Sequence, residues 1–154
     1  MEGAREADGG LYIHVPFCSA ICPYCDFAVR TGKPKVRTNF VETLTQEIAL
    51  WGIWSKPFDS LYLGGGTPSL LEPEQLFRII DAAREHLPMA ENTRIFLEAN
   101  PEDVDAERAR AWHELGITTL SLGVQSFVGS ELRWLGRRHD ANRAHDSVAI
   151  CMES

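Results

Sequence analysis

The sequence lacks the long apolar run of a membrane span, and we expect no leader of an exported protein. No stretch approaches the roughly 18 consecutive apolar residues that a transmembrane helix needs, and the opening MEGAREADGG carries charge and glycine instead of an apolar segment. Positive charge is also scarce, because 15 Lys and Arg against 22 Asp and Glu give a net charge of −7. Such a chain offers no general basic surface to nucleic acid. We therefore expect a cytoplasmic protein with no integral membrane segment and no nucleic-acid partner.

Cysteine is scarce as well, yet three of the four cysteines lie together. Cys18, Cys22 and Cys25 fall within eight positions of LYIHVPFCSAICPYCDF (11–27), whereas Cys151 lies far along the chain. In a reducing compartment, clustered thiols indicate metal binding or catalysis rather than disulfides. Cys151 has helical spacing with apolar neighbours, so we expect it to be a small buried apolar side chain.

Strand and helix patterns alternate four times along the chain. The runs that predict strands are LYIHV (11–15), FDSLYLGGG (58–66), RIFLE (94–98) and ITTLSLGV (117–124). Helical spacing follows each of them, over about 36–51, 73–87, 105–115 and from 140 onward. This order predicts an α/β fold with a parallel sheet and right-handed crossovers. We expect a flexible tail at 1–10 and one core domain over 11–154, which is incomplete because its last helix leads into no further strand.

The cysteine spacing, C-x3-C-x2-C, admits two metal sites. A 4Fe–4S cluster held by three thiolates would keep one iron open for a reactant, as catalytic metal sites do. A structural zinc ion would need a fourth ligand, and His14 could complete a Cys3His set. His14 lies inside the predicted strand, two residues before Pro16, which is an awkward place from which to close a tetrahedron. Spacing alone leaves both metals open.

Polar or glycine-rich segments follow the other three strands. GGGTPS (64–69) matches neither the G-x-G-x-x-G fingerprint nor the P-loop, which requires a lysine; it can bring backbone close to a ligand or simply form a tight turn. Glu98 could accept hydrogen bonds from ribose hydroxyls, Gln125 could donate and accept, and Arg137 could pair with a carboxylate. Each is also compatible with an ordinary surface or turn position. Because the carboxyl ends of parallel strands form the usual ligand-binding rim, their coincidence there favours one site.

Five segments together, YIHVPFCSAICPYCDF, LGGGTP, LEANPE, SLGVQSF and LGRRH, resemble the radical SAM superfamily over Leu11–His139. Within it they resemble the coproporphyrinogen III oxidase-like branch, which includes the HemN and HemW types. The resemblance implies the first part of a partial (β/α)6 barrel. It also implies that Cys18, Cys22 and Cys25 hold a 4Fe–4S cluster whose open iron binds S-adenosylmethionine. One electron from the cluster would cleave that cofactor into methionine and a 5′-deoxyadenosyl radical.

The same resemblance implies roles for further residues. Gly65, Gly66 and Thr67 would contact the methionine part of the cofactor. Glu98 and Gln125 would lie near its ribose and methionine end, and Arg137 would pair with its carboxylate. Tyr12 and Tyr24 occupy the places from which the family contacts the cofactor and the cluster surroundings. His14 matches a family histidine to which we assign no role.

One departure from the HemN pattern separates the branches. The decarboxylating HemN type has a further cysteine after the third ligand and one intervening residue, where this chain has Asp26 and then Phe27. CPYCDF therefore resembles the HemW type, a haem chaperone that delivers haem to haem proteins. The haem-binding H-N-x-x-Y-W segment expected of that type does not occur in this sequence. The expected partners are S-adenosylmethionine, haem, recipient haem proteins and a reductase or flavodoxin-type electron donor. The alternatives are an active oxygen-independent coproporphyrinogen III oxidase and a zinc-bound structural module.

Overall fold

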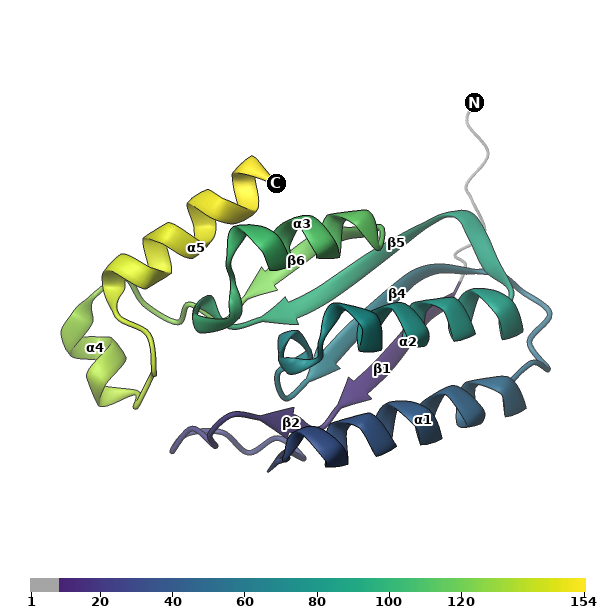
Figure 1. The fold of residues 1–154 in the computed structure, drawn as a ribbon, viewed down its shortest axis with the longest axis horizontal. Helices are drawn as coiled ribbons and strands as arrows, with labels where there is room; N and C mark the ends of the chain where they lie inside the picture. Colours follow the sequence, from purple (N-terminus) through teal and green to yellow (C-terminus); the bar gives the residue numbers. More distant parts are fainter. Residues whose placement is uncertain (1–8) are drawn as a thin grey trace.

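A parallel four-stranded sheet forms the centre of the computed structural model, which describes residues 9–154 (Figure 1). Its strands are β1 (Gly9–Val15), β4 (Phe58–Gly65), β5 (Met89–Ala99) and β6 (Ile117–Leu122), in the order β1-β4-β5-β6. All three pairings are parallel. All the carboxyl ends consequently lie at one edge of the sheet, as the alternating sequence pattern predicted.

Helices cover one face of this sheet, as Figure 1 shows. They are α1 (Pro34–Leu50), α2 (Pro73–His86) and α3 (Ala106–Glu114), while α4 (Gly129–Trp134) and α5 (Ala141–Glu153) follow β6. Local signals fix their starts: Glu72 and Gln75 form a capping box at α2, and the Asp105 side chain accepts a hydrogen bond from Arg108 N at α3. None of the helices in residues 9–154 is long and apolar enough to cross a membrane.

The two faces of the sheet differ in chemistry because side chains alternate along each strand. The helix-covered face is apolar and fully buried, with Val15, Leu61, Leu63 and Leu97 at its centre. The opposite face carries a row of aromatic rings: Tyr12 stacks on Tyr62 at 5.9 Å between ring centroids, and Tyr62 stacks on Phe96 at 5.7 Å. Tyr12 remains 54% exposed. The uncovered face is thus an accessible surface beside the strand ends.

Several elements differ from the sequence prediction. β5 begins at Met89, five residues before the predicted start. The earlier start was missed because MAENT (89–93) shows no strand pattern, and because a register shift separates the pairing of Met89 with Phe58 from the rest of the strand. Gly9 and Gly10, assigned to the tail, belong to β1, whereas residues 1–8 lie outside the described part. A second small sheet pairs β2 (Phe17–Cys18) with β3 (Arg30–Thr31), and two 3-10 turns, η1 (Pro68–Leu70) and η2 (Pro101–Asp103), follow β4 and β5. These pieces and α4 are too short to show a periodicity.

Candidate functional site

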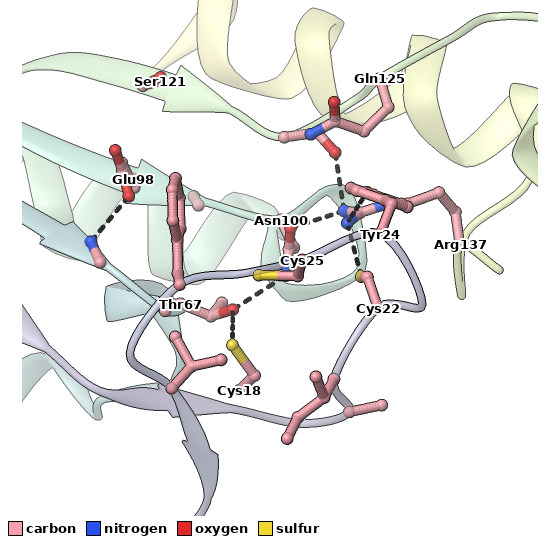
Figure 2. Close-up of a pocket in the computed structure, with 18 residues that line it drawn as sticks. Cys18, Cys22, Tyr24, Cys25, Thr67, Glu98, Asn100, Ser121, Gln125 and Arg137 are labelled. Carbon is pink, nitrogen blue, oxygen red and sulfur yellow. Dashed lines mark hydrogen bonds between the residues drawn. The ribbon is translucent and has the colours of Figure 1, made fainter. Parts of the chain in front are cut away.

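A cavity of about 220 Å³ opens at the carboxyl ends of the strands (Figure 2). The cysteine loop forms one wall, and the segments that follow β4, β5 and β6 supply the rest. All but one of the predicted site residues line it: Cys18, Cys22, Tyr24, Cys25, Gly65, Gly66, Thr67, Glu98, Gln125 and Arg137. The fold therefore brings together residues that are more than a hundred positions apart in the sequence.

The three clustered cysteines are all free thiols in this wall. Cys18 ends β2, and Cys22 and Cys25 are joined by a turn in which Cys25 N donates to Cys22 O at 3.0 Å. Burial raises the pKa of the Cys18 thiol, and a hydrogen bond from the Thr67 hydroxyl to its sulfur, at 3.6 Å, opposes that rise. Cys151, by contrast, packs against the hydrophobic core in α5 but is only half-buried, because α5 lies at the margin of the core.

The glycine run lets β4 approach the first strands closely. Gly66 N donates to Val15 O at 2.9 Å, and a Cβ on Gly66 would lie 2.6 Å from Phe17 O. Gly65 has φ +113°, and a Cβ there would meet the His14 ring at 2.5 Å. The glycines thus form the tight turn and also expose backbone on the cavity wall, so the two interpretations of this motif are compatible.

Glu98 has both carboxylate oxygens engaged. Tyr62 Oη donates to Oε1 at 2.9 Å, and Gly65 N donates to Oε2 at 3.0 Å. Burial and the adjacent carboxylate raise the pKa of Tyr62, which keeps its phenol a hydrogen-bond donor. A carboxylate retains free lone pairs after two such bonds. Glu98 is therefore oriented toward the cavity and can still accept from a ligand.

Arg137 connects the far wall of the cavity to the cysteine loop. Its Nη1 donates to Cys22 Sγ at 3.5 Å and to Tyr24 Oη at 3.3 Å, and its Nη2 donates to Gly123 O at 2.7 Å. Burial alone would lower its pKa, but the hydrogen bond to Tyr24 and the charges of Tyr24 and Cys22 raise it, so the guanidinium stays charged. Its Nε is buried and has no hydrogen-bond partner among the described residues. A buried cation with a spare donor suits an anionic ligand group.

A buried histidine positions the segment that follows β6 on the cavity wall. His139 Nε2 donates to Val124 O at 3.0 Å, and Nδ1 lies 3.3 Å from Glu102 Oε2. This holds the chain just before Gln125, which has a φ of +68°, a value that few non-glycine residues adopt. Gln125 is thereby placed on the cavity wall.

Tyr12, the one predicted site residue that does not line the cavity, and His14, the ligand considered for a zinc site, lie apart from the cavity wall. Tyr12 lies on the uncovered sheet face, with its hydroxyl 3.2 Å from His14 Nδ1, so its cofactor contact stays a prediction. His14 Nε2 donates to Ala28 O at 2.9 Å. With both ring nitrogens engaged, His14 is not placed to complete a zinc site. Among residues 9–154, no three His, Cys, Asp or Glu side chains converge closely enough to hold one metal ion.

Sequence reasoning missed several lining residues, of which Asn100 makes the most contacts. Its carboxamide lies between Arg137 and Thr67 (Figure 2). The signal was present in LEANPE, since Asn100 lies two positions after Glu98 at the same strand end, but nothing in the sequence distinguishes it from a turn residue. Ser121 and Phe27 also line the cavity. Phe27 is 70% exposed, so its ring is accessible where the HemN type has its further cysteine.

The donor set fits an iron–sulfur cluster better than a single ion. The irons of a cubane cluster are at separate corners, so its thiolates need not converge on one point as the ligands of zinc must. Three thiols without a fourth, the unpartnered Arg137 Nε and the glycine-lined wall together suit a three-thiolate cluster with a charged ligand beside it.

Comparisons with known proteins agree with this arrangement. Residues 12–154 match the Radical SAM superfamily. The chain is 34% identical over 151 residues to the haem chaperone HemW of Haemophilus influenzae, covering 94% of this chain and 39% of that protein. It is 36% identical over 143 residues to HemW of Escherichia coli, covering 91% and 38%. The chain thus spans about two fifths of the length of these relatives.

A solved structure shows the same fold. The Escherichia coli coproporphyrinogen III oxidase HemN, described as a radical SAM enzyme, superposes with a TM-score of 0.86 at 25% identity, over 95% of this chain and 34% of that one. This confirms the predicted α/β fold of the radical SAM barrel type. It also confirms the resemblance to the branch that contains both types.

Proposed function

The chain belongs to the radical SAM superfamily, and from this premise we propose that it binds a 4Fe–4S cluster and S-adenosylmethionine as part of a HemW-like haem chaperone. Cys18, Cys22 and Cys25 are the cluster ligands. The observation that carries the proposal is their common position, as three free thiols without a fourth, on one wall of a cavity at the strand ends.

The residues of the chain divide the binding work between them. The backbone of Gly65 and Gly66, with Thr67, lies beside the methionine end of the cofactor. Glu98 accepts from ribose hydroxyls while Tyr62 and Gly65 hold its carboxylate in place. Gln125, Tyr12 and Tyr24 complete the surroundings of the cofactor and the cluster.

Arg137 supplies the charge at this site. Its guanidinium pairs with the cofactor carboxylate, and its Nη1 remains near the cysteine loop. When bound, the cluster supplies the electron that cleaves the sulfonium of the cofactor. Ile21 and Phe27 add an apolar part to the wall of the cavity.

The chaperone part of the proposal is supported by the named relatives and by Phe27. HemW of two bacteria is similar over most of this chain, and the position of the further HemN cysteine is Phe27. Because the chain spans about two fifths of those relatives, haem binding, transfer to recipient haem proteins, a reductase or flavodoxin-type electron donor and a cytoplasmic location are proposals for the whole protein.

Anaerobic reconstitution tests the cluster assignment. We expect the protein to take up four irons and four sulfides and to turn brown, and Cys22→Ala to lose that absorbance. Cys151→Ala is the matched control, because Cys151 packs against the core away from the cavity and should leave cluster uptake unchanged. A colourless protein that retains one zinc ion, or equal cluster uptake by both variants, would contradict the assignment.

A second candidate function, oxygen-independent coproporphyrinogen III oxidase, is favoured by the likeness to the HemN structure. The two are separated by incubating the whole protein, reconstituted and including the part that its relatives have beyond this chain, with coproporphyrinogen III, S-adenosylmethionine and a reductant. The chaperone proposal predicts no loss of propionate carboxyl groups and stable binding of added haem. Decarboxylation would favour the oxidase instead.

A further inference from the structure

Asn100 and Thr67 form a chain of hydrogen bonds that ends on a cysteine of the candidate cluster site. Arg137 Nη2 donates to Asn100 Oδ1 at 2.7 Å, Asn100 Nδ2 donates to Thr67 Oγ1 at 3.1 Å, and Thr67 Oγ1 donates to Cys18 Sγ at 3.6 Å. Figure 2 shows the three links in sequence. These three hydrogen bonds connect the segment after α4 to β2.

The direction of these bonds follows from the chemistry of the groups. A guanidinium can only donate, so it fixes the Asn100 oxygen toward Arg137 and turns the amide NH2 toward Thr67. Thr67 Oγ1 then accepts from Asn100, and its single proton is left for the Cys18 sulfur. The asparagine therefore determines which way the threonine hydroxyl points.

Burial of Thr67 and further hydrogen bonds to Asn100 hold this series of hydrogen bonds in place. The Thr67 residue is only 4% exposed, so solvent has little access to the hydroxyl. Asn100 N donates to Ser69 Oγ at 3.3 Å, and Ser69 Oγ donates in turn to Asp103 Oδ2 at 2.7 Å. The carboxamide is thus fixed from the backbone side as well as from Arg137.

We propose that Thr67 donates a hydrogen bond to the Cys18 thiolate of the bound cluster and that Asn100 is the positioning residue that directs it, so that the pair raises the reduction potential of the cluster. This rests on the proposed function. Reduction adds negative charge that spreads onto the sulfurs, and a donor aimed at one of them stabilises the reduced form more than the oxidised one.

Redox titration of the reconstituted cluster, followed by electron paramagnetic resonance, tests this. Thr67→Val removes the proton donor at nearly constant shape, and we expect the equilibrium constant for reduction to fall about tenfold, which is about 59 mV for one electron. Thr67→Ser keeps the hydroxyl and should restore the wild-type potential. Thr67→Ala provides the same comparison should the valine protein not fold.

Asn100→Ala tests the positioning step. It should lower the potential in the wild-type background and add no further shift to Thr67→Val, because the hydroxyl on which it acts is already absent. Equal shifts in both backgrounds would show that Asn100 acts by another route and would overturn its assignment.

Iron content and absorbance of each variant distinguish failure of this inference from failure of the proposed function. Intact clusters with identical potentials in wild type, Thr67→Val and Thr67→Ser would overturn this inference alone. A wild-type protein that takes up no cluster would overturn the proposed function, and the inference with it.

Discussion

Replacing Gly66 with alanine provides a sharp test of how closely β4 approaches the cysteine-bearing strand. The new Cβ would lie 2.6 Å from the Phe17 carbonyl oxygen and 2.9 Å from its carbonyl carbon. Both are backbone atoms, and Gly66 N to Val15 O and Thr67 N to Phe17 O hold the two segments together at 2.9 and 2.7 Å. No flexible side chain can move aside, so the segments themselves must separate by several tenths of an ångström.

The size of the effect follows from two opposing contributions. Overpacking of this kind costs about 1–3 kcal/mol, whereas replacing a glycine reduces the freedom of the unfolded chain and returns about 0.4–1 kcal/mol. We expect a net loss of about 1–2 kcal/mol in the free energy of unfolding of Gly66→Ala. For a chain of this size each kcal/mol lowers the Tm by about 2–4 °C. Because Phe17 precedes Cys18, cluster uptake should fall as well.

Urea unfolding followed by circular dichroism measures this loss, and Gly129→Ala is the matched control. A Cβ on Gly129 would meet only Arg133 Nη1 at 3.5 Å, which is ordinary van der Waals contact at the start of α4. That variant should change stability by less than about 0.5 kcal/mol. Equal unfolding curves for the two variants would refute the close approach at Gly66.

Substitutions at two further residues, Asp103 and Trp112, give the remaining predictions. Burial raises the pKa of the Asp103 carboxyl, so its ionisation opposes folding. The stability that the protonated carboxyl contributes is fully present below its pKa in the unfolded chain, near 3.9, and is lost as pH rises through its pKa in the folded protein. Asp103→Asn keeps an acceptor for Ser69 and should therefore be more stable than wild type at pH 7 by an amount that shrinks toward pH 4; an advantage that grows on acidification would contradict this. Trp112 is 1% exposed, and its indole N–H has no partner among the described residues. Trp112→Ala should therefore lower the free energy of unfolding, measured by thermal unfolding, by about 3–5 kcal/mol. Trp112→Phe keeps a buried ring and removes the unpartnered donor, so it should lower that free energy by less than half as much. Equal losses in the two variants would contradict this expectation.

The order of the main strands and helices was predictable because each has a periodicity of its own. The helix over Pro73–His86 shows apolar residues on one face and a proline at its first position, and both features depend only on neighbouring residues. The convergence of Cys18, Glu98 and Gln125 was predictable for another reason. Parallel strands place their carboxyl ends at one edge, so topology alone brought these residues together.

What the sequence could not predict depends on contacts between distant segments. The two-residue strands of the small sheet pair across the cysteine loop, where Arg30 N donates to Pro16 O, and no local pattern encodes that pairing. The part played by Asn100 depends on Arg137, 37 positions later, which fixes the orientation of its amide. Tyr12 lies on the uncovered face of the sheet and not on the cavity wall, so its contact with the cofactor stays a prediction.

The contact between Arg137 and Cys22 also bears on the order in which the site is assembled. The two residues are separated by 115 positions, so during synthesis from the amino terminus the cysteines emerge long before the arginine that holds their loop. Until then the loop is shaped by its local turn, by the two-residue strand pair and by the contact of Cys18 with Thr67, but Cys22 lacks its contact with Arg137. Thiols in that state are available to any soft metal they meet. A ribosome-bound chain that has not yet reached Arg137 should therefore discriminate less between zinc and iron–sulfur clusters than the finished fold does. Selective cluster binding then requires that the cluster be delivered after Arg137 has been synthesised.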